Sequence, residues 1–124
     1  ACVVVLDART YRMQRVVPVG NKPMGLAIDE QTGQVFVTNA GDSTVSMLDV
    51  KSDRVLRTFG AGSSPHGVAV DTTAGHVFVA NSQDRSVGVY DAQSGTVLAT
   101  MPVPVRPYVL AMSGPAALLV VGGR

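Results

Sequence analysis

The chain has 124 residues, of which 46% are apolar and 15% charged, and its formal net charge is +1. This composition predicts a folded, apolar-rich domain and excludes a disordered segment. A net charge near zero disfavours nucleic-acid binding and attachment to a membrane surface, because both need many cationic contacts. A single cysteine excludes an internal disulfide framework and a cysteine-based zinc site. The sequence contains no apolar run long enough for a transmembrane helix, so no membrane insertion is expected.

The chain opens on an apolar run that predicts a β-strand, Cys2-Val3-Val4-Val5-Leu6. Branched side chains such as valine pack well on the pleated surface of a sheet. Cys2 is therefore expected to be a small buried hydrophobe rather than a reactive thiol.

The next segment, residues 20–61, predicts four short strands joined by turns. The expected strands are residues 25–28, 35–38, 45–48 and 54–58. The intervening segments are rich in Asp, Asn and Gly, which favour turns through local hydrogen bonds and positive φ. Turns this short leave no room for crossover helices, so neighbouring strands are expected to run antiparallel.

The same pattern returns 42 residues later, without a gap. Recurring positions include Pro23, Pro65 and Pro107; Gly25 and Gly67; Val35-Phe36-Val37 and Val77-Phe78-Val79; and Asp7, Asp49 and Asp91. Four strands per repeat at this period predict an all-β fold made of β-propeller blades, each with four antiparallel strands. The recurring aspartates are interpreted as turn-forming residues, since they are too regular to make one active site.

The repeat also resembles a known family. Pro-x-Gly-x-Ala-x-Asp begins at Pro23, Val-Phe-Val-Thr-Asn ends at Asn39, and Val-x-x-x-Asp begins at Val45. These motifs are similar to the YVTN family of β-propeller repeats, and residues 78–81 are a second copy of the name motif. The Trp-Asp pair of WD40 repeats is absent, since the chain has no tryptophan. The resemblance implies a bacterial or archaeal protein in a periplasmic or extracellular location.

The phase of the repeat divides the single propeller segment into four parts. We expect a half blade at 1–19, blades at 20–61 and 62–106, and a half blade at 107–124. About three repeats cannot close a ring, because propellers typically have four to eight blades. Two interpretations stay open: the chain is a piece of a longer propeller, or it is completed by oligomerisation. In the second, a homodimer forms a six-bladed ring by pairing the last strands of one copy with the first strands of the other.

Candidate site residues follow from the position of the turns in such a fold. The turns before the inner strands, and those between the second and third strands, are expected to meet around the central channel. Met24, His66 and Tyr108 occupy equivalent positions, each directly after the recurring proline. The candidate ligand- or partner-binding residues are Met24, His66, Arg106, Tyr108, Asn39 and Asn81. For the two asparagines, the alternative is a structural role in capping tight turns.

The function expected from these features is a non-catalytic scaffold that binds a protein or small ligand on the channel face. The sequence contains no nucleophile elbow, phosphate loop or zinc signature, and neither a cofactor nor a metal is expected. His76 is expected near the face opposite His66, so the two should not share a metal. The alternative is a segment of a larger propeller enzyme, such as a quinoprotein-like dehydrogenase, a lactonase or a haem-d1-type domain, by analogy of fold alone.

A basic set recurs along the outer strands. Arg9, Arg12 and Arg15 return as Lys51, Arg54 and Arg57. These charges are expected to protect exposed strand edges from aggregation. The alternative is an acidic partner on the rim.

Overall fold

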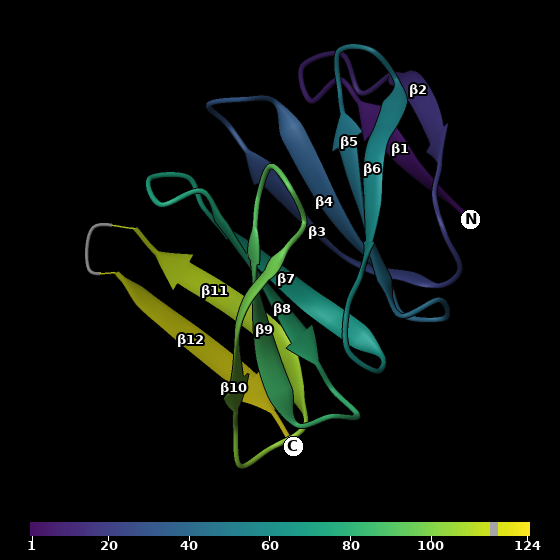
Figure 1. Ribbon diagram of the computed structural model, residues 1–124. Helices are drawn as coiled ribbons and strands as arrows, with labels where there is room; N and C mark the ends of the chain where they lie inside the picture. The colour runs from purple at the N-terminus through teal and green to yellow at the C-terminus, as the bar shows by residue number, and fades with distance from the viewer. Residues whose placement is uncertain (115–116) are drawn as a thin grey trace.

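The computed structural model describes residues 1–114 and 117–124, and these form twelve β-strands in four antiparallel sheets (Figure 1). The strands are β1 (Cys2–Leu6), β2 (Met13–Pro18), β3 (Pro23–Asp29), β4 (Gln34–Asn39), β5 (Thr44–Asp49), β6 (Arg54–Gly60), β7 (Pro65–Asp71), β8 (His76–Asn81), β9 (Ser86–Asp91), β10 (Val97–Pro102), β11 (Pro107–Ser113) and β12 (Leu118–Gly123). The all-β fold class and the four-stranded blades are thus confirmed. The described part of the chain contains no helix that could cross a membrane.

The two central sheets are simple meanders, with strand orders β3-β4-β5-β6 and β7-β8-β9-β10. The first and last sheets each contain two strands, β1-β2 and β11-β12. At the turns, an aspartate repeatedly accepts a hydrogen bond from the backbone amide two residues later. Asp7, Asp49 and Asp91 do so at 2.8 to 2.9 Å, and Asp29 and Asp71 do so at 3.0 and 3.1 Å. The interpretation of these residues as turn-formers is confirmed, because this geometry fixes the backbone between neighbouring strands.

The apolar core lies between sheets rather than within one sheet. Phe36 and Met47 of the first central sheet cluster with Val77 and Val79 of the second. A second cluster joins Val17 of β2 to residues of β4 and β5. Both faces of β4 are therefore covered, and complete burial of a valine or phenylalanine side chain stabilises the fold by about 1.5 to 3 kcal/mol.

The inner strands β3, β7 and β11 lie side by side, and glycine permits their close approach (Figure 1). A Cβ atom added to Gly67 would lie only 2.7 Å from the carbonyl oxygen of Tyr108, and one at Gly25 would collide with the carbonyl of His66. Only glycine leaves room for a neighbouring backbone at this distance. In the third repeat the equivalent residue is Val109, whose side chain is exposed.

In the two-stranded sheets at the ends of the chain, β1 and β12 each have one unpaired edge within the described residues. β1 pairs with β2 alone, and β12 pairs with β11 alone. The strands equivalent to β1 in the central sheets, β5 and β9, have partners on both sides. For this reason the expectation that Cys2 is buried is wrong, and its thiol is exposed.

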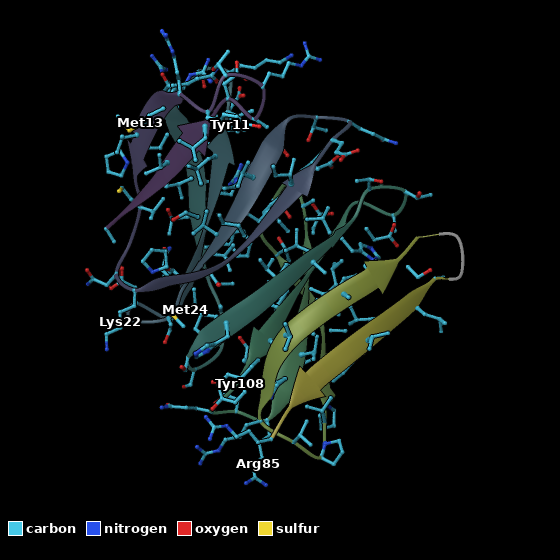
Figure 2. All side chains as sticks on the ribbon, turned by 180° about the vertical axis from the view of Figure 1, so that it is seen from behind. Tyr11, Met13, Lys22, Met24, Arg85 and Tyr108 are labelled. Carbon is cyan, nitrogen blue, oxygen red and sulfur yellow. The ribbon has the colours of Figure 1, made fainter. Side chains whose placement is uncertain are left out.

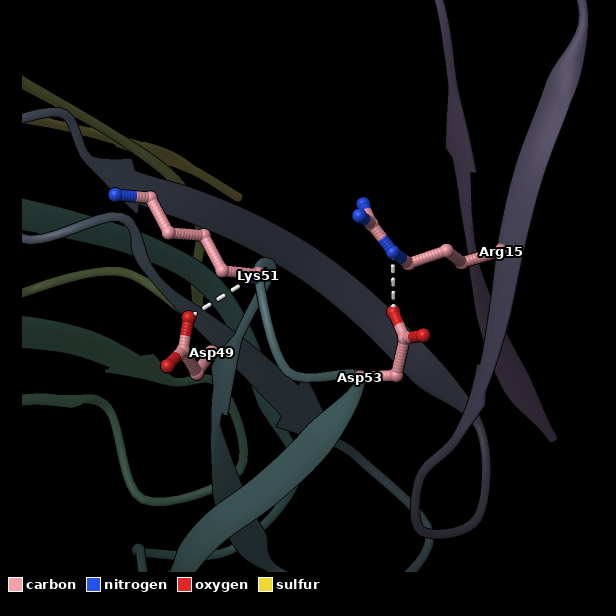
Figure 3. Close-up of polar contacts among 4 residues, drawn as sticks. All are labelled: Arg15, Asp49, Lys51 and Asp53. Atoms are coloured by element: carbon pink, nitrogen blue, oxygen red, sulfur yellow. Dashed lines mark hydrogen bonds and ion pairs between the residues drawn. The ribbon is translucent and has the colours of Figure 1, made fainter.

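The recurring basic residues lie on the exposed outer strands and their turns. Arg15 of β2 forms an ion pair with Asp53 in the turn before β6, with Nε and Oδ1 2.6 Å apart (Figure 3). In the same turn, the backbone amide of Lys51 donates to the carboxylate of Asp49 at 2.9 Å. Ion pairs this exposed typically contribute less than about 1 kcal/mol, so the pair adds little to the contact between the sheets.

Candidate ligand-binding face

The candidate site lies where the inner strands begin. We define the mouth face by the turns before the inner strands, 19–22, 61–64 and 103–106, and by the turns between the second and third strands, 40–43 and 82–85. Antiparallel pairing brings these turns to the same end of the sheets. Figure 2 shows Lys22, Met24, Arg85 and Tyr108 toward this end, and Tyr11 and Met13 toward the other.

Two aspartates tie the turns of the mouth face together. The carboxylate of Asp42 accepts hydrogen bonds from the backbone amide of Asn21 at 2.8 Å and from its side-chain amide at 2.9 Å. In the next repeat, Asp84 accepts from the backbone amide of Ser63 at 2.8 Å. Each acid thus links the turn after its blade's second strand to the turn before the first. Both carboxylates are engaged in shaping the face.

Asn39 and Asn81 are buried and act inside the sheets. The side-chain amide of Asn39 donates to the hydroxyls of Ser46 at 2.9 Å and Thr44 at 3.1 Å. The side-chain oxygen of Asn81 accepts from the backbone amide of Gly62 at 3.0 Å. The structure therefore does not bring these two predicted site residues to the surface beside His66, and their contacts agree with the alternative structural role.

His66, at the start of β7, lies edge-on to Tyr108, at the start of β11. The two ring centroids are 4.9 Å apart and the planes meet at 86°. The guanidinium of Arg124 lies 5.6 Å from the centre of the same tyrosine ring, within cation–π range. Residues from two repeats and the C-terminal segment thus form one continuous contact on the mouth face.

The orientation of the His66 ring is fixed by its own turn. Its Nδ1 lies 2.9 Å from the carbonyl oxygen of Ser64 and 3.3 Å from the hydroxyl of Ser82. A carbonyl oxygen only accepts hydrogen bonds, so Nδ1 carries the proton in this contact. In the neutral ring, Nε2 is then an acceptor, and no hydrogen bond to it is present among the described residues.

Two hollows adjoin at Met24 and His66. The mouth hollow, about 380 Å³, is lined by Lys22, Met24, Ala40, Gly41, Ser43, Ser63, Ser64, His66 and Gln83. The wall hollow, also about 380 Å³, runs along the inner strands and is lined by Met24, Gly25, Leu26, His66, Gly67, Val68, Tyr108, Val109 and Leu110. The structure thus brings three predicted residues together, Met24, His66 and Tyr108. Arg106 is exposed next to them, and its backbone pairs with that of Arg124.

The sequence places the turns that carry Lys22, Ser63 and Ser64 on this face, but these residues were not among the candidate site residues. The signal for Lys22 was available, because it precedes the repeat's proline just as Ser64 and Arg106 do. His76 was placed at the other end, and it does pair in register with Asp71, at the end of β7 remote from His66. The described residues contain no group of three or more metal-ligating side chains.

A third hollow is apolar and lies away from the mouth face. It measures about 330 Å³ and is lined mainly by residues of β1 and β3, including Val4, Leu6, Leu26 and Ile28. In the central sheets, the equivalent place beside β5 and β9 is occupied by β4 and β8, whereas among the described residues β1 has a partner on one side only. This apolar hollow therefore lies at the unpaired edge of the two-stranded sheet β1-β2.

Comparison with known proteins supports the fold. No family model matches the chain, and no curated protein matches it. Among solved structures, it is similar to hydrazine synthase from Kuenenia stuttgartiensis, with a TM-score of 0.89 and 22% identity over 97% of this chain. It is also similar to a functionally unknown protein from Desulfotomaculum acetoxidans, with a TM-score of 0.85 and 18% identity over 99% of this chain. The chain spans 35% and 42% of those two chains, respectively. At such identities these likenesses show a β-propeller fold and nothing further.

Proposed function

We propose that this chain is a β-propeller segment that serves as a non-catalytic scaffold and binds a protein or small ligand on its mouth face. One observation carries the proposal: the side chains that differ between repeats, Met24, His66 and Tyr108, border two adjoining hollows. The frame around them is constant, since each follows a proline at the same repeat position. A surface that varies on a constant frame is suited to specific recognition.

The likeness to hydrazine synthase supports the fold but not an activity for this chain, because the identity is only 22%. A scaffold also agrees with the chemistry of the mouth face. His66 there contacts a backbone carbonyl, a serine hydroxyl and a tyrosine ring, and none of these is a carboxylate that would orient it as a general base.

The proposal is tested by fragment screening with the ¹⁵N-labelled chain, observed by NMR. Fragments that bind are expected to shift the amide signals of residues around Met24, His66 and Tyr108. His66→Ala and Tyr108→Ala should abolish these shifts, whereas His76→Ala, at the other end of β7-β8, should not. Shifts confined to the apolar hollow around Val4 and Leu26 would contradict the mouth face as the site.

We also propose that the repeats are of the YVTN type and that the protein is bacterial and works in the periplasm or outside the cell. This proposal is supported by the motifs that begin at Pro23 and Val45 and end at Asn39. A family model built from homologues of these repeats, with this chain included, would test the assignment.

A further proposal concerns the open edges of β1 and β12: a second copy covers them, giving a six-bladed ring. In the repeat register of β4 with β5, where Val37 faces Ser46, β12 of one copy would place Val121 opposite Val4 of the other. Such pairing would cover apolar side chains that are now exposed, among them Leu6 and Val120. Val109 has a side chain where Gly25 and Gly67 permit close approach of the next inner strand. The contact between β11 of one copy and β3 of the other would therefore be wider than the contacts of β3 with β7 and of β7 with β11.

Light scattering at micromolar concentration tests the ring. A mass of twice 12.9 kDa is expected, and a monomer over the whole concentration range would overturn the proposal. With Val4→Cys and Val121→Cys combined in a Cys2→Ser background, a disulfide-linked dimer should form under oxidation. Val4→Cys alone in the same background is the matched control, because it has no cysteine opposite to it in this register.

A further inference from the structure

The mouth face carries more basic than acidic side chains, although the net charge of the whole chain is only +1. Lys22, Arg85, Arg106 and Arg124 all belong to the mouth-face end and are exposed. The acidic residues there are Asp42 and Asp84, whose carboxylates already accept hydrogen bonds from turn amides. Every other acidic residue lies in the turns at the opposite end, within 7–12, 29–33, 49–53, 71–75 and 91–95, and these turns also hold Arg9, Arg12 and Lys51. The mouth face is therefore cationic although the chain as a whole is nearly neutral.

The mouth hollow has the donors that an anion needs. Lys22 supplies a positive charge, Ser43, Ser63 and Ser64 supply hydroxyls, and Gln83 supplies an amide. No aspartate or glutamate is among the residues that line it. Charge-assisted hydrogen bonds to carboxylate or phosphate oxygens are stronger than neutral ones, so this lining favours an oxyanion over a neutral polar group.

The wall hollow adjoins the mouth hollow at Met24 and His66, and its lining is mainly apolar rather than polar. Met24, Leu26 and Val109 give it an apolar surface, and the ring of Tyr108 borders it. Met24 and Leu26 are both largely exposed in the described chain. Removal of apolar surface from water is favourable, so a ligand gains from placing an apolar body here.

We propose that the mouth face binds an amphipathic organic anion. Its carboxylate or phosphate group occupies the mouth hollow at Lys22 and the serine hydroxyls, and its aromatic or aliphatic body lies along the wall hollow. Met24 and His66 line both hollows and mark the junction between head and body. This inference rests on the proposed function, since it names the ligand class for the same face.

The test is a set of NMR titrations with benzoate, phenyl phosphate, inorganic phosphate and benzyl alcohol. Benzoate and phenyl phosphate should bind more tightly than either inorganic phosphate, which lacks the body, or benzyl alcohol, which lacks the charge. The ranking of benzoate against phenyl phosphate identifies the preferred head group. Raising the salt concentration should weaken the binding of both anions and leave the affinity for benzyl alcohol unchanged.

The chain's two lysines provide a matched pair of variants. Lys22→Gln should weaken the binding of benzoate and phenyl phosphate by about fivefold, which is the effect of losing one exposed charge contact of about 1 kcal/mol. Lys51→Gln, at the opposite end, should leave both affinities unchanged. The spectrum of Lys22→Gln without ligand must overlay that of the parent away from the substituted turn, so that a misfolded turn is not taken for a lost contact.

The outcomes separate this inference from the proposed function. If fragments bind at His66 and Tyr108 but benzyl alcohol binds as tightly as benzoate, the anion inference is overturned and the scaffold survives. Equal binding by the parent and Lys22→Gln overturns the inference in the same way. If the four probes leave the signals of the mouth face unchanged while screened fragments shift them, the anion inference alone is overturned. If neither the probes nor the fragments shift these signals, small-ligand binding at the mouth face is contradicted together with the anion inference.

Discussion

Phe36 and Val120 occupy the same place in the repeat, but Phe36 is completely buried and Val120 is 63% exposed. The strands that carry them, β4 and β12, have the same length and the same pairing with an inner strand. Their surroundings differ, because β4 also pairs with β5 and packs against a sheet on each side, whereas β12 pairs with β11 alone among the described residues. Burial in this fold is thus a property of neighbouring repeats, as in other arrays in which each repeat contacts only the next.

The largest expected effect comes from testing this pair directly. Phe36→Ala should lower the free energy of unfolding by about 3 to 5 kcal/mol, because it leaves a cavity between two sheets. Val120→Ala should change it by less than about 0.5 kcal/mol, since its side chain is already exposed. Urea unfolding followed by far-UV circular dichroism measures both. A large loss in Val120→Ala would show that something covers β12 in solution, as the proposed second copy would.

A second comparison concerns the inner strands. Gly67→Ala should lower the free energy of unfolding by about 1 to 3 kcal/mol, because the new Cβ would lie 2.7 Å from the carbonyl oxygen of Tyr108. Gly60→Ala is the matched control, since nothing lies within 4 Å of its added Cβ. It should stabilise the fold by about 0.4 to 1 kcal/mol by restricting the unfolded chain. Equal effects in the two variants, measured by urea unfolding, would show that β7 and β11 can separate at little cost.

These comparisons also show how much of the fold could be predicted from the sequence. Strand positions, turn aspartates and blade type follow from the 42-residue period, because the pairing of neighbouring strands is decided locally. The exposure of Cys2 could not be predicted in the same way. Its strand has the apolar pattern of β5 and β9, and what decides its burial is a strand on its other edge.

The site was predictable to a similar extent. The repeat phase placed Met24, His66 and Tyr108 at equivalent points, and the structure brings them to adjoining hollows. The same phase did not predict that Asn39 and Asn81 turn inward, because that depends on hydroxyl and amide partners contributed by the neighbouring strand and turn. Residue type and spacing do not reveal such partners.

A smaller effect is expected at the turns of the mouth face. Asp84→Ala removes the hydrogen bond to the amide of Ser63 and should lower the free energy of unfolding by about 1 kcal/mol. Arg15→Gln removes the exposed ion pair with Asp53 at the other end and should cost less than about 0.5 kcal/mol. Thermal unfolding ranks the two. If Arg15→Gln were the more costly change, the contact between β2 and the turn before β6 would be stronger than its exposure indicates.

The smallest expected effect is a pH dependence of stability at Tyr90. The equivalent residues of the other repeats, Leu48 and Leu6, have no group that can ionise. Burial raises the pKa of the Tyr90 hydroxyl above its ordinary value, although hydrogen bonding with Asn81 and the backbone of Gly62 opposes the change. The folded chain therefore retains the phenol proton to a higher pH than the unfolded chain does. The resulting contribution to stability is complete below the ordinary pKa of about 10 and is lost as the pH rises through the raised pKa.

Urea unfolding at a series of alkaline pH values tests this linkage. The parent chain should lose stability with rising pH more steeply than Tyr90→Phe, which has no phenol to ionise in the core between sheets. Tyr11→Phe, which changes an exposed ring at the opposite end, should keep the parent's slope. If Tyr90→Phe and the parent lost stability in parallel, the Tyr90 hydroxyl would have to reach solvent as freely in the folded chain as in the unfolded one. The sheet β7-β8-β9-β10 would then admit solvent as readily as the two-stranded sheets at the ends do. The difference in burial between Phe36 and Val120 would in that case not extend to the position of Tyr90.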